Sequence, residues 1–288
     1  MNQLPHLILT VLIAALVAAL VPHARTTAPT KHETAFERVM RTRTLRCAYG
    51  IWPPLMKMDP NTKKLSGIDY EIVESIGRVA SLKIDWQDEV GVGAVPDQLE
   101  SGKQDVMCVT LWENARRAQR LETTKPTYYM PLYAYVREGN HRFDNKAQPI
   151  NDEKASIALV DGAAQKAIAD GSFPKAKQYS LPPDTDASHS LLAVATGKAD
   201  IVFADESAIA DYNATNPKHK LRRVEGLPPL RIYGDVFAVA KRETELRDLL
   251  NAALDELRND GTIDRILDSY KTASGAILRP APVYTSAP

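Results

Sequence analysis

The chain has little of several residues on which whole classes of protein depend. Of its 288 residues, two are cysteine, so one intramolecular disulfide is the most it could form. Its six histidines (His6, His23, His32, His141, His189 and His219) show no metal-ligand spacing, and we expect neither a metal nor a cofactor. An excess of charge of either sign is also missing, because Lys plus Arg and Asp plus Glu both number 36. A nucleic acid or an acidic membrane surface is therefore not an expected partner, whereas a small neutral or zwitterionic ligand remains possible.

Long hydrophobic runs are missing except near the N-terminus. Leu7 to Val21 form an apolar stretch broken only by Thr10, and Pro22 follows. Its length is typical of a signal-peptide core and short for a membrane-spanning helix. No Lys or Arg precedes it, however, and the small-residue cleavage sites are poor. We expect residues 1–24 to be a signal peptide or an uncleaved N-terminal anchor, followed by a linker over residues 25–42.

The two cysteines, Cys47 and Cys108, lie in the apolar segments LRCAYG and DVMCVT. An exported protein could oxidise them, but disulfide geometry is demanding and cysteine is also a common buried apolar residue. We expect both thiols to lie in neighbouring strands of one lobe and to be free, because a bridge between mid-strand positions would strain the sheet.

The chain has 44% hydrophobic and 25% charged residues, a composition typical of globular proteins. Its sequence pattern predicts a repeated alternation of strand and helix. Strands are expected at LRCAYG, LKIDWQ and DVMCV, and helices at IDYEIVESIGRVASL, near Val95 to Leu99 and over the polar segment WENARRAQRLETT. After a polar gap the rhythm restarts with ASIALV and continues to ESAIADYNAT. A strand at RIYGDVFAVAK and a long helical pair end the pattern.

One turn occurs twice. LESGKQDVMCVT contains Gly102, Lys103 and Asp105, and VATGKADIVFADES has Gly197, Lys198 and Asp200 at the same spacing. In both copies a helix ends at a Gly, which adopts a left-handed cap cheaply, and a buried apolar strand follows. Such turns also arise by chance in α/β proteins, but two copies fit two similar lobes separated by a cleft.

The order of the segments resembles the amino-acid-type extracellular solute-binding proteins of ABC importers, which have a type II periplasmic binding fold. The resemblance runs from about Thr42 to Thr272. It rests on LRCAYGIWPPL, LSGIDYEIVESIG, LESGKQDVMCVT, the segment ending TTKPTYY, TGKADIVFADES and the long C-terminal segment that begins IYGDVFAVAK. It implies an α/β fold of two Rossmann-like lobes joined by two crossover strands: a discontinuous lobe 1 (residues 43–135 plus 234–272), lobe 2 (136–233) and a C-terminal tail (273–288).

The same resemblance implies the residues of a ligand clamp. Arg117 matches the arginine that binds a ligand carboxylate, and Thr110, seven positions earlier, matches its hydroxyl partner; a guanidinium suits a carboxylate because it binds in bidentate fashion. Arg116 is the alternative if the alignment is shifted by one residue. A further alternative is that Arg117 is an ordinary surface arginine of a basic helix. Asp205 matches the acidic residue that accepts the ligand's ammonium, although it could equally be a helix N-cap.

Three features depart from the family pattern. Gly162, Ala163 and Ala164 stand where Gly-Thr-Thr is usual, which keeps the backbone donors and removes the hydroxyls. Trp112 stands where Ser or Thr is common, and Trp52 holds the aromatic-wall position. The two indoles favour a more apolar or flatter pocket, although a lone Trp more often only packs.

The sequence therefore predicts a periplasmic solute-binding protein that captures a small amino-acid-like ligand and delivers it to the membrane permease of an ABC importer. We expect a monomer without catalytic residues, because the cleft segments supply no second acid-base partner beside Asp205 and Glu206. The alternatives are a binding module of a sensor or redox system and, from another class, an enzyme on this fold such as a cyclohexadienyl dehydratase.

Overall fold

A computed structural model describes residues 33–186, 188–270 and 275–281 of the chain. The helices are α2 (Ala35–Thr42), α3 (Ile68–Val79), α4 (Val95–Glu100), α5 (Ala115–Ala118), the 3-10 turn η1 (Gln148–Ile150), α6 (Ala164–Ser172), α7 (Ser188–Ala195), α8 (Glu206–Thr215), α9 (Thr244–Asn259) and α10 (Thr262–Ser269). The strands are β1 (Thr44–Tyr49), β2 (Lys57–Met58), β3 (Leu65–Ser66), β4 (Lys83–Glu89), β5 (Val106–Trp112), β6 (Leu121–Thr123), β7 (Tyr128–Arg137), β8 (Ser156–Val160), β9 (Lys177–Leu181), β10 (Ile201–Asp205), β11 (Leu221–Arg223) and β12 (Arg231–Ala240). None of the helices in these ranges is long and apolar enough to span a membrane. The predicted signal or anchor segment lies outside the described residues.

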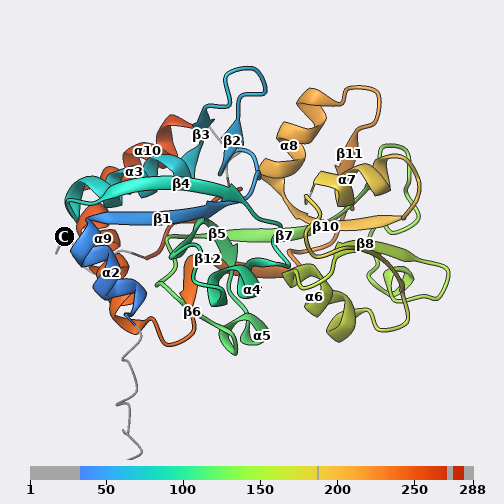
Figure 1. Ribbon diagram of the computed structural model, residues 1–288. Helices are drawn as coiled ribbons and strands as arrows, with labels where there is room; N and C mark the ends of the chain where they lie inside the picture. The colour runs from blue at the N-terminus through green and yellow to red at the C-terminus, as the bar shows by residue number, and fades with distance from the viewer. Residues whose placement is uncertain (1–32, 187, 271–274, 282–288) are drawn as a thin grey trace, which may run out of the picture. The chain divides into compact units, whose positions relative to one another are not determined.

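The main sheet has the strand order β4-β1-β5-β12-β7-β10-β8-β9. β1 is parallel to β4 and β5, and β8 is parallel to β9 and β10. The long strands β12 and β7 are antiparallel to each other in the middle and connect these two parallel groups. Helix α3 lies beside β4 and β5, and helix α9 lies beside β6 and β12, whereas α6, α7 and α8 lie around β8 and β10 at the other end of the sheet (Figure 1).

The apolar side chains gather in separate cores. One core combines residues from α2 to the start of β7 with residues of β12, α9 and α10, which are distant in sequence. Two further clusters contain residues from the rest of β7 through to the segment after β11. We call the elements around the first core lobe 1 and those around the other two lobe 2. The boundaries proposed from the sequence stay a prediction, but residues 35–42 of the expected linker form helix α2.

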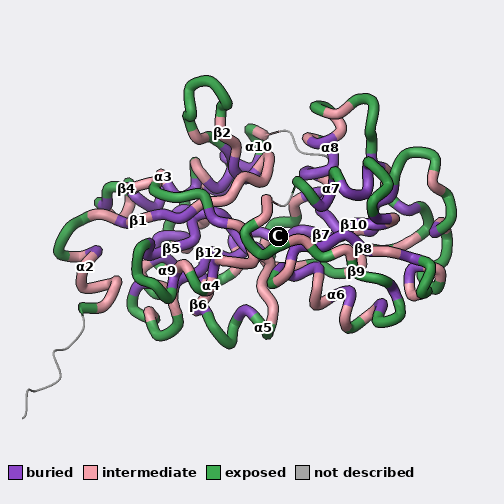
Figure 2. The backbone as a smooth tube through the Cα atoms, turned by 45° about the vertical axis from the view of Figure 1, so that its right-hand side comes forward, coloured by how far each residue is buried: buried purple, intermediate pink, exposed green. Residues whose placement is uncertain are grey.

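The strand β10 of lobe 2 shows why a buried strand is apolar at successive positions. Along β10, Ile201 and Phe203 belong to one cluster, and Val202 and Ala204 belong to the other. Successive side chains of a strand point to opposite faces, so both faces of this part of the sheet are covered. The central strands are accordingly buried, whereas the loop between β2 and β3 is exposed (Figure 2).

The repeated turn has the same structure in both lobes. Gly102 and Gly197 have φ angles of +71° and +80°, in the left-handed region that favours glycine. The Asp105 side chain accepts a hydrogen bond from the Arg46 amide at 2.8 Å, and the Asp105 amide donates to the Arg46 carbonyl. Asp200 exchanges the same pair of bonds with Ser156. Each aspartate thus ties its own strand to the neighbouring parallel strand, and the turns are equivalent points of two similar lobes.

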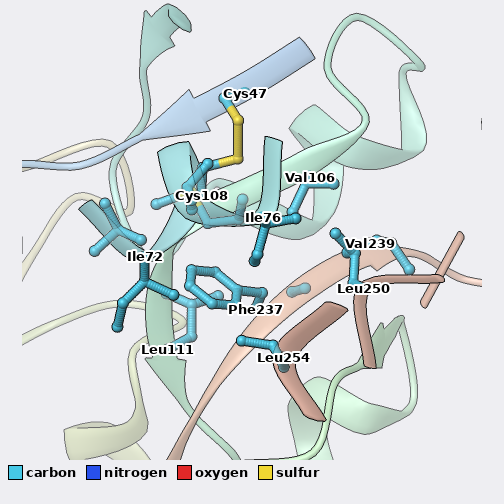
Figure 3. Close-up of a cluster of buried hydrophobic side chains, with 14 of the residues drawn as sticks. Cys47, Ile72, Ile76, Val106, Cys108, Leu111, Phe237, Val239, Leu250 and Leu254 are labelled. Carbon is cyan, nitrogen blue, oxygen red and sulfur yellow. A yellow bond between two sulfur atoms is a disulfide. The ribbon is translucent and has the colours of Figure 1, made fainter. Parts of the chain in front are cut away.

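The prediction that Cys47 and Cys108 are free thiols is wrong. They lie in the neighbouring strands β1 and β5 and form a disulfide with a Cα–Cα distance of 5.4 Å (Figure 3). Cys47 pairs with Val106 in the parallel register, so Cys108 lies two positions further along, on the same face of the sheet. This diagonal offset puts the Cα atoms within the usual disulfide range of about 4.4–6.8 Å, so the strands need not be displaced.

The expected polar helix over WENARRAQRLETT is also largely wrong. Only the four residues of α5 are helical, and Leu121–Thr123 form strand β6, which pairs with β12. Pairing with an existing strand overrides the local helical pattern of this segment.

Candidate functional site

A cavity of about 250 Å³ lies between the two lobes. It lies beyond the carboxyl ends of β1 and β5, where the ligand sites of open α/β sheets are found. From lobe 2, the start of α6 and the loop after β9 complete its wall. Of the residues predicted to contact a ligand, the wall contains Trp52, Thr110, Trp112, Arg117, Ala163 and Ala164.

Among the residues that the structure describes, Arg117 is the one arginine in the wall, and it is 7% exposed. Asn114 caps the short helix α5 by accepting a bond from the Arg117 amide at 3.0 Å, which fixes the backbone from which the side chain extends. The guanidinium donates to the carbonyl of Trp112. Burial lowers the pKa of Arg117 to about 10, so the group stays charged at neutral pH. Arg116 instead bonds Asp170 at 3.1 Å, and its side chain is 64% exposed.

Thr110 belongs to a buried polar network below the cavity. Its amide and its hydroxyl both bond Asp69, at 2.7 and 2.9 Å, and its hydroxyl also lies 2.7 Å from the Tyr128 hydroxyl. Tyr128 donates a further bond of 2.6 Å to Asp69. Burial raises the pKa of Asp69 to about 6. The Thr110 hydroxyl is therefore already engaged, and it would serve a ligand only by sharing its bonds.

Aromatic rings form one side of the cavity. Trp52 and Trp112 meet edge to face with ring centroids 6.2 Å apart, and Trp112 stacks on Tyr233 at 6.0 Å. The two indoles give the wall flat apolar faces, which suit an alkyl chain or a cation.

The N-terminus of α6 supplies the second feature that suits an anion. Ala163 is its N-cap residue and gives no side-chain cap. The first backbone N–H groups of a helix and its dipole favour a carboxylate. Gly162, with a φ of +81°, does not line the cavity; it leads the chain into α6 beside Gly93.

The assignment of Asp205 to a ligand ammonium stays a prediction, and the structure shows which contacts its carboxylate already makes. It is fully buried and does not line the cavity. One of its oxygens accepts the Ala208 amide at 2.8 Å, as an N-cap of α8, and the other accepts the Trp52 indole N–H at 2.9 Å. The N-cap interpretation therefore describes this geometry, and the carboxylate also links lobe 2 to lobe 1.

Four carboxylates in the wall were missed by the sequence reasoning. Asp235 of β12 is fully buried and lies near Arg117. Three others, which we call the acidic rim, come from the end of β4 and the loop after β9: Glu89, Asp184 and Asp186. Nothing in the local sequence distinguishes them from ordinary surface acids, and only the contact between the lobes brings them together.

That contact depends on two glycines. The Gly93 amide bonds the Pro183 carbonyl at 3.1 Å, and a Cβ on Gly93 would lie 2.0 Å from the Asp161 carbonyl oxygen. A Cβ on Gly91 would lie 2.6 Å from the Asp184 Cα. The absence of side chains at these positions lets the two loops touch.

The cavity can therefore bind a small polar molecule by its charges. Arg117 and the start of α6 suit a carboxylate, the indoles suit a chain, and the carboxylates suit a positive group. Among the described residues, no cluster of three or more His, Cys, Asp or Glu side chains could hold a metal ion.

The chain is similar to several known proteins. The probable histidine-binding protein of Campylobacter jejuni is 26% identical over 214 residues, which cover 72% of this chain and 77% of that protein. The virulence sensor protein BvgS of Bordetella bronchiseptica is 32% identical over 181 residues, covering 59% of this chain and 13% of that protein. An amino acid ABC transporter substrate-binding protein of Streptococcus pneumoniae, solved bound to L-arginine, aligns with a TM-score of 0.69 at 16% identity, over 81% of this chain and 96% of that one.

The structural likeness confirms the predicted two-lobed α/β fold. The profile of the bacterial extracellular solute-binding proteins, family 3, matches residues 45–273. The chain belongs to this family of extracellular solute-binding proteins, as its sequence resemblance predicts.

Proposed function

We propose that this protein captures a small amino-acid-like solute in the cavity between its lobes and delivers it to the permease of an ABC importer. The family assignment supports solute binding, and the relatives described above include a probable histidine-binding protein and an ABC transporter component. The cavity volume of about 250 Å³ is below the roughly 300–1,000 Å³ of drug-sized sites, which fits a small ligand.

One observation carries the proposal: the buried, charged Arg117 and the uncapped start of α6 line the same cavity from different lobes. A ligand carboxylate placed between them would interact with both lobes at once. Ligand binding would therefore favour the closed arrangement, because a ligand shifts a conformational equilibrium by its differential affinity for the two states. Trp52, Thr110, Trp112, Ala163 and Ala164 would form the surrounding wall.

A thermal-shift screen tests the proposal. The protein is unfolded, dialysed and refolded to remove any carried solute, and it is then screened against amino acids, keto acids and small amines. A ligand present at 100 times its Kd raises the free energy of unfolding by about 2.7 kcal/mol. We expect at least one amino acid to raise the melting temperature and to bind in calorimetry. If keto acids or amines alone bind, the amino-acid assignment is wrong.

We further propose export to the periplasm, no catalysis and a monomeric state. Besides the family, the disulfide between Cys47 and Cys108 supports export, since disulfides persist in oxidising compartments. Alkylation of periplasmic fractions and light scattering of the purified protein test the location and the oligomeric state.

A sensory role is the second candidate. The 32% identity to part of BvgS favours it, and the direct bond between Trp52 and Asp205 joins the two lobes. A strain lacking this gene separates the two roles. Loss of uptake of the bound solute indicates transport, whereas normal uptake with an altered transcriptional response to that solute indicates sensing.

A further inference from the structure

The described residues of the cavity wall include more carboxyl groups than cationic groups. They contain Arg117 as the one arginine or lysine, against four carboxyl groups: Asp235 at the base and the three members of the acidic rim. A neutral amino acid would balance one positive and one negative group. It would leave the rim without a partner.

Asp235 has the properties of a receptor for a positive group. It is 0% exposed, and its Oδ2 has no hydrogen-bond partner within the described parts of the chain. Its Oδ1 receives only a long bond of 3.4 Å from Thr110. Burial, together with the charges of Asp69 and Asp205, raises the pKa of Asp235 well above its usual value. A buried carboxyl in this state gains free energy when a ligand cation supplies its missing partner.

Arg117 and Asp235 suit the two ends of one zwitterion. They are close enough to influence each other electrostatically, yet they form no direct ion pair within 4.0 Å. The α-carboxylate and α-ammonium of an amino acid could therefore each take one of these side chains. Asp205, whose two oxygens are engaged elsewhere, is not required for this.

The acidic rim brings like charges together. Glu89 comes from lobe 1, whereas Asp184 and Asp186 come from lobe 2, and the contact at Gly91 and Gly93 holds the two loops against each other. Burial and the charge of Asp186 raise the pKa of Glu89. No lysine or arginine among the described residues forms a salt bridge with a rim carboxylate. Like charges brought together in this way disfavour the closed state unless a cation lies between them.

We propose that the cavity selects an amino acid whose side chain carries a second positive charge, with Asp235 receiving the α-ammonium and the acidic rim facing the side-chain cation. The indoles of Trp52 and Trp112 would cover the connecting chain and the cation. An organic cation fits better than a metal ion, because no cluster of possible metal ligands is found in the described ranges. This inference rests on the proposed function and adds the class of ligand.

Calorimetry with matched ligands tests it. Arginine and citrulline have the same length and differ in the charge of the side chain. Norleucine has the carbon chain of lysine and lacks its terminal ammonium. We expect the cationic member of each pair to bind the wild-type protein at least about tenfold more tightly, because charge complementarity selects against the neutral partner. The preference should decrease as salt is added, since the rim is partly exposed.

Substitutions assign the preference to residues. Glu89→Gln and Asp186→Asn should each weaken arginine binding several-fold and leave citrulline binding within about twofold. Asp85→Asn, on the same strand as Glu89 but outside the cavity wall, removes an equal charge and should change neither. Asp235→Asn should weaken the binding of arginine and of citrulline alike. It should leave the affinity for 5-guanidinovaleric acid, which lacks the α-amino group, at the wild-type value. That last comparison separates loss of the ammonium contact from loss of the fold.

Two results would overturn the inference and leave the proposed function intact. One is equal affinity for the neutral and cationic members of both pairs. The other is a parallel loss of arginine and citrulline binding in the rim variants, which would indicate a structural role for the rim. If no amino acid of either charge binds, the proposed function fails and the inference fails with it.

Discussion

Removing the disulfide between Cys47 and Cys108 should destabilise the protein by a predictable amount. The bridge closes a loop with a sequence separation of 61 residues. With the chain-entropy relation for a cross-linked unfolded state, a loop of this length corresponds to about 14 cal/mol/K, or about 4 kcal/mol at 25 °C. We therefore expect the Cys47→Ala/Cys108→Ala variant to lose about 4 kcal/mol, plus a smaller loss from truncating two fully buried side chains.

Urea unfolding of three samples measures this effect: the oxidised wild type, the wild type reduced under denaturing conditions and refolded with reductant, and the double variant. Reduced wild type keeps both sulfur atoms, so it isolates the cross-link from the packing. Loss of the cross-link should also raise the m-value, because the unfolded chain becomes less compact. Val106→Ala, a truncation in the same core, serves as a control that lowers the midpoint and leaves the m-value unchanged.

The reasoning is refuted if oxidised and reduced wild type unfold with the same midpoint and the same m-value. Alkylation of the denatured, unreduced protein provides an independent check. Two free thiols would mean that the bridge does not form and that the expectation from the sequence was right.

Two further predictions concern the site. Arg117→Ala should weaken ligand binding by about 3–5 kcal/mol, because the buried carboxylate of the ligand loses its partner. Arg116→Ala removes an exposed side chain and should change the binding free energy by less than about 1 kcal/mol. If calorimetry gives the reverse order, the alignment is off by one residue. Trp52→Phe should lower the free energy of unfolding by about 1–3 kcal/mol, because buried Asp205 loses a donor. Trp86→Phe, whose indole bonds a partly exposed carboxylate, should cost less, and equal urea midpoints for the two variants would contradict the buried bond.

Much of the fold follows from local pattern. The apolar period of α3, the turns at Gly102 and Gly197 and the unbroken apolar runs of β5 and β10 each depend on residues close together in the chain. Side-chain direction in a helix or strand is set by its period, so burial can be read from sequence at these elements. Two segments depart from the expected local structure: residues 35–42 form helix α2, and in WENARRAQRLETT the pairing of β6 with β12 outweighs a weak helical preference.

The site was only partly predictable from the sequence, because local pattern does not specify contacts between residues far apart in the chain. The resemblance to a known family pointed to Arg117 and to the start of α6, and both line the cavity. The sequence alone assigned Asp205 to the ligand, but the structure engages both of its oxygens, one of them with Trp52 from the other lobe. That partner lies 153 residues away, and no local signal specifies it.

By itself, then, the sequence determined the order of the elements and their division between two similar lobes. Its resemblance to a known family pointed to the arginine and tryptophan residues that line the cavity. Only the tertiary structure decided three features. They are the disulfide between Cys47 and Cys108, the hydrogen bond from Trp52 to Asp205, and the contact at Gly91 and Gly93 that brings the carboxylates of the acidic rim together. The physical reason is common to all three. Strand register and the contact between lobes set distances between residues far apart in the chain, and those distances follow from the packing of the whole fold.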